Sequence, residues 1–132
     1  MNLPNSEQVV QEFWRLMATN DFASVAAVLS HDFVLEWPQS QERIRGATNF
    51  AQMNQEYTAH GLWRFTLNRL VASATEVVTD VSVTDGVQHA RAVSFFTVAE
   101  GKIIRLVDAM FDTLVDSGNG IALAAPQIGV QK

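Results

Sequence analysis

The chain has no cysteine among its 132 residues, which excludes disulfide bonds, thiolate zinc sites and cysteine nucleophiles. It also lacks any apolar run of membrane-spanning length, so no membrane partner is expected. Proline is scarce, at 3 residues, and no low-complexity linker or internal repeat divides the chain. The opening residues, MNLPNSEQ, have neither the basic region nor the apolar core of a signal peptide, so a cytoplasmic location is expected.

Positive charge is also scarce. Lysine and arginine number 9 against 14 aspartates and glutamates, and the formal net charge is −5. Because nucleic-acid binding needs clustered basic side chains, we expect no nucleic-acid partner. The hydrophobic fraction of 48% indicates one soluble domain with a substantial core.

Two common kinds of ligand site have no counterpart in the sequence. The three histidines, His31, His60 and His89, show neither HxxxH nor HExxH spacing, so no metal site is expected. No GxGxxG or GxxxxGK phosphate-binding motif occurs either. We therefore expect no cofactor.

The chain begins with the apolar spacing of a helix. Asn5 and Gln8 can form a capping box at its start, and Asn20 suits the left-handed conformation that ends a helix. Its apolar stripe consists of Val9, Val10, Phe13, Trp14 and Met17. This stripe predicts a helix with one face on the core.

Two more helices and a strand are predicted before the midpoint. Asp21 can cap a short helix over residues 22–29, and Thr48 can cap a third helix. The third helix carries Phe50, Met53 and Tyr57. Between these helices, residues 33–37 alternate and stop at Pro38, which is typical of a strand. The following QSQERIRG is expected to be a polar connection.

In the second half the apolar period changes from 3.6 to 2. One predicted strand places Trp63, Phe65 and Leu67 on a single face. Residues 77–83 form the next strand and 88–98 a long central one, while Asp85-Gly86 and Glu100-Gly101 are hairpin signals. Segregated helices followed by an antiparallel meander predict an α+β fold with the helices on one face of the sheet.

Three segments make this prediction more specific. In chain order, DFASVAAVLSHDFVLEWP, ERIRGATNF and VSFFTVAEGKIIRL resemble the SnoaL-like (polyketide cyclase-like) branch of the nuclear transport factor 2-like superfamily, over about residues 5–111. The resemblance implies a cone-shaped, barrel-like roll: a curved antiparallel sheet with three N-terminal helices packed over its concave face and an internal pocket. It also implies frequent homodimers through the sheet and varied chemistry, since the superfamily holds isomerases, cyclases, epoxide hydrolases, dehydratases and non-catalytic binders.

Asp108 is the main catalytic candidate. If residues 102–110 form a strand, Asp108 shares a face with Leu106, and Arg105 on the other face favours solvent. Burial in an apolar site raises a carboxyl pKa, which suits general acid or base chemistry near neutral pH. In SnoaL-type cyclases the catalytic aspartate lies on this last strand after a GKI-like turn, and Asp108 occupies the matching place.

The segment LVDAMFDTLVD is also consistent with a helix. In that alternative the aspartates at 108, 112 and 116 would form an ordinary solvated face. We predict a strand at least through Met110. The helix alternative, and a purely structural carboxylate, stay open from the sequence alone.

The other candidates would shape and line a small-molecule site. Tyr57, the only tyrosine, is a second catalytic candidate because its phenol can donate to a developing oxyanion. Ketosteroid isomerases carry their base where this chain has Trp37, so a steroid-type proton shuttle is not expected. The predicted substrate-binding residues are Trp14, Met17, Trp37, Met53, Trp63, Ser94 and Phe96. Ordinary core packing is an equal alternative for each aromatic ring.

The C-terminal segment differs in kind. SGNGIALAAPQIGVQK resembles the first motif of peptide deformylases, GxGLAAxQ, with Ala122 in place of the second glycine. The matching positions are Gly120, Leu123, Ala124, Ala125 and Gln127. In that family the matching glutamine assists a metal, but this sequence has neither HExxH nor cysteine, so deformylase activity is not expected. We predict a domain at 1–115 and a tail at 116–132 that covers the mouth of the cone or a neighbouring subunit.

Two functions are therefore considered. The first is an enzyme without cofactor that performs acid/base chemistry, a cyclisation, isomerisation or hydration/dehydration, on a small apolar carbonyl-type substrate. The second is a non-catalytic small-ligand-binding or dimeric assembly module with the same fold. A homodimer through the sheet is expected in either case.

Overall fold

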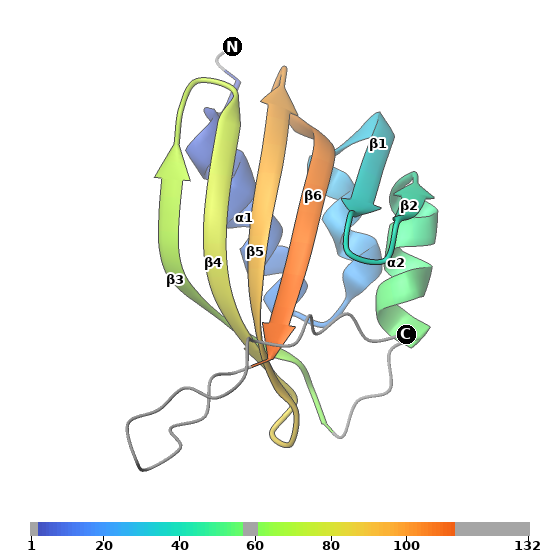
Figure 1. The fold of residues 1–132 in the computed structure, drawn as a ribbon. Helices are drawn as coiled ribbons and strands as arrows, with labels where there is room; N and C mark the ends of the chain where they lie inside the picture. Colours follow the sequence, from blue (N-terminus) through green and yellow to red (C-terminus); the bar gives the residue numbers. More distant parts are fainter. Residues whose placement is uncertain (1–2, 57–60, 113–132) are drawn as a thin grey trace.

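A computed structural model describes residues 3–56 and 61–112. Three helices and six strands follow one another along the chain (Figure 1): α1 (Ser6–Ala18), η1 (Phe22–Val28), β1 (Leu29–Trp37), β2 (Glu42–Arg45), α2 (Ala47–Glu56), β3 (Arg64–Ala72), β4 (Glu76–Thr84), β5 (His89–Ala99) and β6 (Lys102–Asp112). The strands form one sheet in the order β2-β1-β6-β5-β4-β3. None of the helices in these ranges is both long and apolar enough to cross a membrane.

The predicted capping box starts α1. The backbone N–H of Gln8 donates to Asn5 Oδ1 at 2.8 Å, and the Asn5 N–H donates to Gln8 Oε1 at 3.0 Å. Asn20, with φ of 63°, adopts the predicted left-handed conformation just beyond the helix. Both predictions are confirmed, because local side-chain bonds decide where this helix begins and ends.

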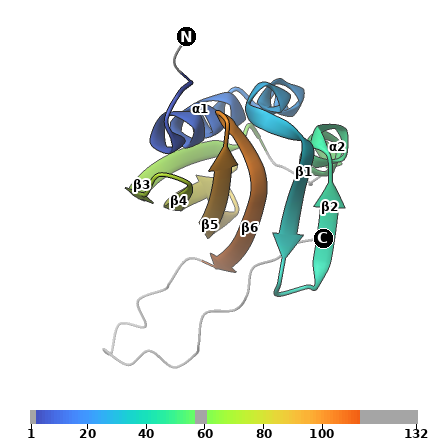
Figure 2. The same ribbon diagram turned by 90° about the horizontal axis from the view of Figure 1, so that it is seen from above.

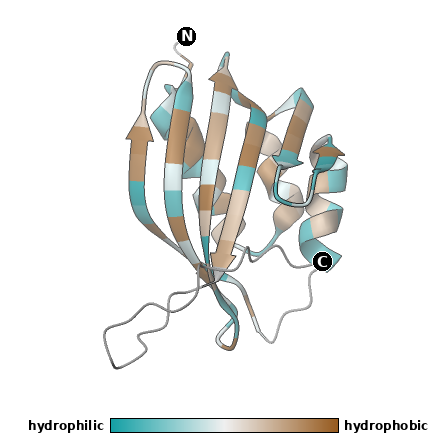
Figure 3. Cartoon of the chain, viewed as in Figure 1, coloured by the Kyte–Doolittle hydropathy of each residue, from teal (hydrophilic) through white to brown (hydrophobic). Residues whose placement is uncertain are grey.

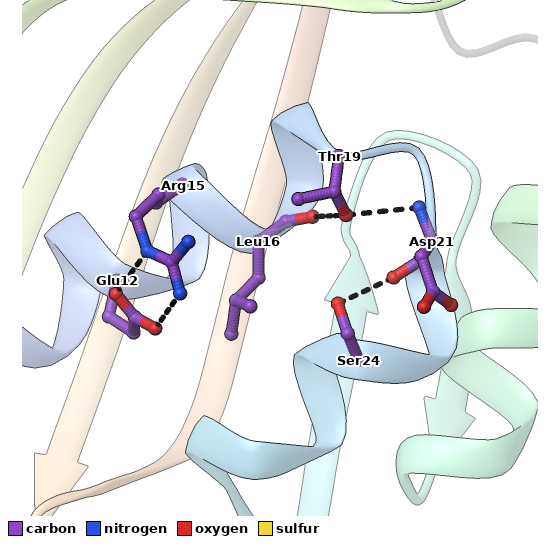
Figure 4. A network of polar contacts seen from close by, with 6 residues as sticks. All are labelled: Glu12, Arg15, Leu16, Thr19, Asp21 and Ser24. Atoms are coloured by element: carbon purple, nitrogen blue, oxygen red, sulfur yellow. Dashed lines mark hydrogen bonds and ion pairs between the residues drawn. The ribbon is translucent and has the colours of Figure 1, made fainter.

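The start of η1 differs from the prediction. The Asp21 side chain makes no capping hydrogen bond. Instead the Ser24 hydroxyl reaches back to the Asp21 carbonyl at 2.6 Å, and the Asp21 N–H donates to Thr19 Oγ1 at 3.1 Å (Figure 4). The turn between α1 and η1 is therefore stabilised by hydroxyl groups, and the predicted Asp21 cap is wrong.

Two local predictions around α2 are also wrong. Thr48 lies inside α2, which follows Gly46 with φ of 86°; the Gly46 carbonyl accepts the first helical bond, from the Phe50 N–H at 3.1 Å. The segment taken as a polar connection contains the short strand β2, which pairs with β1. Its polarity reflects an edge strand with exposed Arg43 and Arg45.

The sheet is mixed because β1 runs parallel to β6, while all other neighbours are antiparallel. It curves around the helices, which lie on its concave side (Figure 2). The chain from 102 to 112 is a strand, so the predicted strand through Met110 is confirmed and the helix alternative is wrong over these residues. The predicted α+β class with helices over a curved sheet is confirmed.

A bulge early in β6 changes which residues face the core. The register with β5 shifts between Thr97 and Val98, so that Thr97 opposes Arg105 and Val98 opposes Ile103. Ile103 is thereby fully buried, although simple alternation from Leu106 would have placed it on the outer face. The core between sheet and helices is filled by Phe13, Phe33, Leu35, Phe96 and Ile103.

Candidate functional site

Asp108 lies on the concave face, at the centre of the sheet. Its cross-strand partner on β5 is Ser94, which is 1% exposed. The Ser94 hydroxyl donates to Asp108 Oδ1 at 2.7 Å. Because Leu106, two residues earlier on the same strand, is buried as well, Asp108 faces the side on which the helices pack.

Burial changes the acidity of this carboxyl group. Loss of hydration raises the pKa of Asp108 to about 6, against the opposing hydrogen bonds of the Ser94 hydroxyl and the Trp37 indole. No charged group among the described residues contributes to this pKa. The residue as a whole still keeps part of its surface accessible. Asp108 is thus a poorly hydrated acid on a residue that is only partly buried.

The end of β1 brings Trp37 next to Asp108. Glu36 is in register with Val107 on the parallel strand β6, so the following residue on each strand points to the concave side. The Trp37 ring is buried, with 6% exposure. Gln39, just beyond β1, accepts the Met110 backbone N–H at 3.2 Å and ties this corner to β6.

Glu36 points the other way, as the alternation along residues 33–37 predicts. Its carboxylate accepts from Arg105 Nε at 3.1 Å and pairs with Arg43 at 2.9 Å on the outer face. The hydrogen bond from Arg105, with a further contribution from Arg43, holds the Glu36 pKa below its usual value. On the outer face the Glu36 carboxylate is therefore paired with arginines, whereas the described residues that act on Asp108 are neutral donors.

The polar residues of the concave face form a line, which we call the polar row: Thr79, Ser94 and Asp108. They are direct cross-strand neighbours on β4, β5 and β6. At one end of the row, Trp14 Nε1 on α1 donates to Thr79 Oγ1 at 3.1 Å, and at the other end lies Trp37. Two indoles thus bracket three oxygen-bearing side chains in an otherwise apolar interior.

Next to the polar row, the concave face has a group of short buried side chains on β4 and β5. Val81, Val83 and Ala92 form a small buried cluster, here called the floor, that is separate from the main core. Four larger residues pack against this floor, all of them partly exposed: Trp14, Trp63, Phe65 and Met110. Large rings that stay partly accessible around a floor of short side chains are the arrangement expected where a ligand can enter.

The structure brings some of the predicted site residues together. Asp108, Ser94 and Trp37 come together, and Trp14 and Trp63 share the floor. Asn20 fixes Trp63 by two hydrogen bonds of 2.8 Å to its backbone. The predicted apolar binding residues also contact the main core: Met17, Trp37 and Phe96 belong to it, and Trp14, Met53 and Trp63 pack against it. Met17, Met53 and Phe96 are not among the described residues that pack against the floor. Tyr57 lies outside the described residues.

Three residues of this region were not among the predicted candidates: Thr79, Phe65 and Met110. Thr79 and Phe65 belong to strand patterns that the sequence reveals, but their places, in the polar row and against the floor, depend on strand register. Among the described residues, no group of three or more His, Asp or Glu side chains could hold a metal ion.

Comparison with known proteins gives a consistent picture. The family model described as SnoaL-like domain matches residues 10–106, and that of polypeptide deformylase matches residues 81–132. No curated protein matches the chain. The deformylase match overlaps β4, β5 and β6, which the structure places in the same sheet as β1.

Several solved structures share the fold. A provisionally assigned ketosteroid isomerase from Kribbella flavida is 25% identical, with a TM-score of 0.74, and the match covers 92% of this chain and 93% of that one. An LEH-like epoxide hydrolase from M. tuberculosis is 24% identical (TM-score 0.61; 76% and 78% covered). A provisionally assigned SnoaL-like polyketide cyclase from Shewanella putrefaciens is 10% identical (TM-score 0.68; 83% and 91% covered).

Proposed function

Because the chain belongs to the SnoaL-like domain family, we propose that it is a small-molecule enzyme in which Asp108 performs acid/base chemistry. The substrate class is an apolar carbonyl-type molecule, and the reaction a cyclisation, isomerisation or hydration/dehydration. The observation that carries this proposal is the poorly hydrated carboxyl group of the partly buried Asp108, between Ser94 and Trp37. The fold is shared with ketosteroid isomerases, epoxide hydrolases and polyketide cyclases, which supports a site of this kind.

The proposed step is a proton transfer. With a pKa of about 6, Asp108 is mostly ionised at pH 7 yet basic enough to accept a proton from the carbon next to a carbonyl group. The electron pair of that C–H bond moves toward the carbonyl oxygen and gives an enolate, and the proton on Asp108 returns to carbon or oxygen. Tyr57 is proposed to donate to that oxygen. This step needs no cofactor.

The substrate would lie on the floor, between the rings around it. Trp14, Trp63 and Phe65 supply apolar walls, and Trp37 closes the site beyond Asp108. Ser94 would contribute to substrate binding through Asp108, because its hydroxyl group donates a hydrogen bond to that carboxylate. Met17, Met53 and Phe96 would shape the site indirectly through the core against which they pack.

Hydrogen exchange tests the proposed step without knowledge of the product. A panel of cyclic ketones is incubated in D₂O with and without the protein. NMR should show that the protons next to the carbonyl group are replaced by deuterium faster when the protein is present. Asp108→Asn should slow this exchange at least about 100-fold, since general base catalysis contributes factors of that size. Asp80→Asn, on the outer face, is the matched control and should leave exchange unchanged. Exchange at the parental rate in Asp108→Asn would exclude this role.

The alternative is a binding module with the same site and no chemistry. It is favoured by one observation: among the described residues, no second ionisable group acts on Asp108, whereas acid/base pairs usually consist of two groups with separated pKa values. Ketones that bind without any accelerated exchange would support this alternative.

A homodimer through the sheet is part of the proposal. Four apolar residues on the outer face, Val71, Val78, Phe95 and Val107, are in direct cross-strand register, and we call them the outer row. Phe95 is 47% and Val71 60% exposed. Both hydrophobic and hydrophilic stretches occur along these strands (Figure 3). A contiguous exposed apolar surface of this kind is typical of an interface.

A further inference from the structure

The distribution of positive charge bears on what the site can bind. Every lysine and arginine in the described ranges is exposed. The arginines nearest the centre of the sheet are paired on its outer face, Arg91 with Asp80 and Arg105 with Glu36. Within the part of the chain that the structure describes, no cationic side chain therefore reaches the concave face beside Asp108.

Asp108 consequently carries its charge without a counter-ion from the described residues. Ser94 donates a hydrogen bond and the Trp37 indole favours the ionised carboxylate, but both groups are neutral. An ionised group in a poorly hydrated site is strongly unfavourable unless an opposite charge is close. A cation on the ligand would supply that charge, whereas an anion on the ligand would repel the carboxylate.

The rings around the floor favour the same kind of ligand. Trp14, Trp63 and Phe65 are partly exposed where they pack on Val81, Val83 and Ala92. The faces of aromatic rings carry partial negative charge and attract ammonium groups, most strongly where water is excluded. Met110, the cross-strand neighbour of Ala92, adds only an apolar surface.

We infer that the site selects its ligands by charge: it binds apolar molecules that carry a protonated amine in preference to neutral ones, and it rejects carboxylates and phosphates. This inference rests on the proposed location of the site, but not on the proposed chemistry. It narrows the substrate class to uncharged carbonyl compounds and to those that bear a basic amine.

Three probes with the same ring system test the inference. They are 2-naphthylmethylammonium, 2-acetylnaphthalene and 2-naphthoate, with binding measured by calorimetry on the full chain at pH 8. The ammonium probe should bind at least tenfold more tightly than the ketone, and the naphthoate at least tenfold more weakly than the ketone. Equal affinity of the naphthoate and the ammonium probe would overturn the inference.

Two controls assign the effect to Asp108. In Asp108→Asn the preference for the ammonium probe over the ketone should fall below twofold, while Asp80→Asn should retain it. The parent protein at pH 4.5, with Asp108 protonated, should show the same loss without any substitution. A preference that persists under both conditions would contradict the inference.

The outcomes separate this inference from the proposed function. If the protein prefers the ammonium probe but does not accelerate proton exchange from ketones, only the proposed catalysis is contradicted. If exchange depends on Asp108 but the three probes bind without a charge preference, only the inference about charge selectivity is contradicted. If none of the three probes binds, there is no ligand site on the floor and both proposals fail.

Discussion

Asp108 and Asp80 lie on opposite faces of the same sheet, and their surroundings shift their pKa values in opposite directions. Burial raises the pKa of Asp108 from 3.8 to about 6, whereas the hydrogen bond from Arg91 lowers the pKa of Asp80. The two residues have the same side chain, so the difference comes from the neighbours alone. On the concave face these are neutral donors, and on the outer face an arginine.

This contrast predicts opposite effects on stability. The folded state holds the Asp108 proton more tightly than the unfolded state, so the parent loses stability as pH rises from about 4 to about 6. Asp108→Asn should remove this loss and be about 1–3 kcal/mol more stable than the parent at pH 8, but not at pH 4. Urea denaturation at both pH values measures the difference.

Asp80→Asn is the control of opposite sign. In the parent, Arg91 favours the ionised form of the Asp80 carboxyl group. The stabilisation by this pair is therefore present near neutral pH and is lost as the pH falls through the lowered pKa of Asp80. The variant should be less stable than the parent by about 0.2–1 kcal/mol at pH 7, with a smaller difference at pH 3. If both variants had the same pH dependence, the assignment of the two environments would be wrong.

Ser94→Ala should raise the Asp108 pKa still further. The hydroxyl hydrogen bond favours the ionised carboxylate, and a bond to a charged group contributes about 1.5–3 kcal/mol. The acidic limb of the exchange-rate profile, or the carboxyl ¹³C titration, should therefore move about one pH unit or more to higher pH. Thr79→Val removes the other hydroxyl of the polar row, which accepts from Trp14, and should leave the titration in place.

At the residue scale, the sequence predicted what depends on alternation alone. The outward position of Glu36 and the inward position of Asp108 both follow from it, with Arg105 as the guide. The position of Trp37 beside Asp108 and the row from Thr79 to Asp108 could not be predicted in this way. They depend on the register between strands that are far apart in sequence, which no local pattern contains.

At the element scale, the segment Lys102–Asp112 shows how pairing overrides ambiguous periodicity. Its apolar residues are consistent with a helix as well as a strand, but pairing with β5 on one side and β1 on the other satisfies its backbone as a strand. The bulge that turns Ile103 inward was not predictable, because Ile103 and Ile104 are both apolar and alternation from Leu106 selects Ile104 for the inner face. The short strand β2 was missed for a related reason, since a polar edge strand resembles a loop.

Helix capping separates a prediction that is confirmed from one that is wrong. Asn5→Ala removes the capping box of α1 and should lower the free energy of unfolding by about 0.5–2 kcal/mol. Asp21→Ala should have little effect, because that side chain caps nothing at η1. Chemical denaturation of both variants checks this pair, and a larger loss in Asp21→Ala than in Asn5→Ala would contradict the structure.

For the whole molecule, the division of the chain at residue 115 and the role of the tail stay predictions. The deformylase match begins at residue 81, but residues up to Asp112 pair within the sheet. Hence the part of that match inside the described residues belongs structurally to the SnoaL-like domain. The predicted tail, residues 116–132, lies outside the described residues, as does its proposed covering of the cone mouth. The cytoplasmic location also stays a prediction.

Assembly is the property of the whole molecule that one substitution tests best. The outer row crosses four strands, and its flanks carry the pairs Asp80–Arg91 and Glu36–Arg105. In a dimer with twofold symmetry the same face meets itself, so each apolar row packs on its copy and the flanking charges can pair between subunits. A charge placed in the middle of the row should therefore abolish the dimer.

Phe95→Asp places a charge in the middle of the outer row. Because Phe95 is 47% exposed, its replacement should disturb the core of one subunit little. Sedimentation equilibrium should give twice the chain mass of 14.6 kDa for the parent and a single chain mass for the variant. Val87→Asp is the control, since Val87 is also exposed, at 64%, but follows the hairpin glycine Gly86 and lies outside the outer row. At about 100 μM, an interface with a binding free energy of more than roughly 6 kcal/mol is already mostly associated. If the parent is monomeric at this concentration, the outer row is not a homodimer interface.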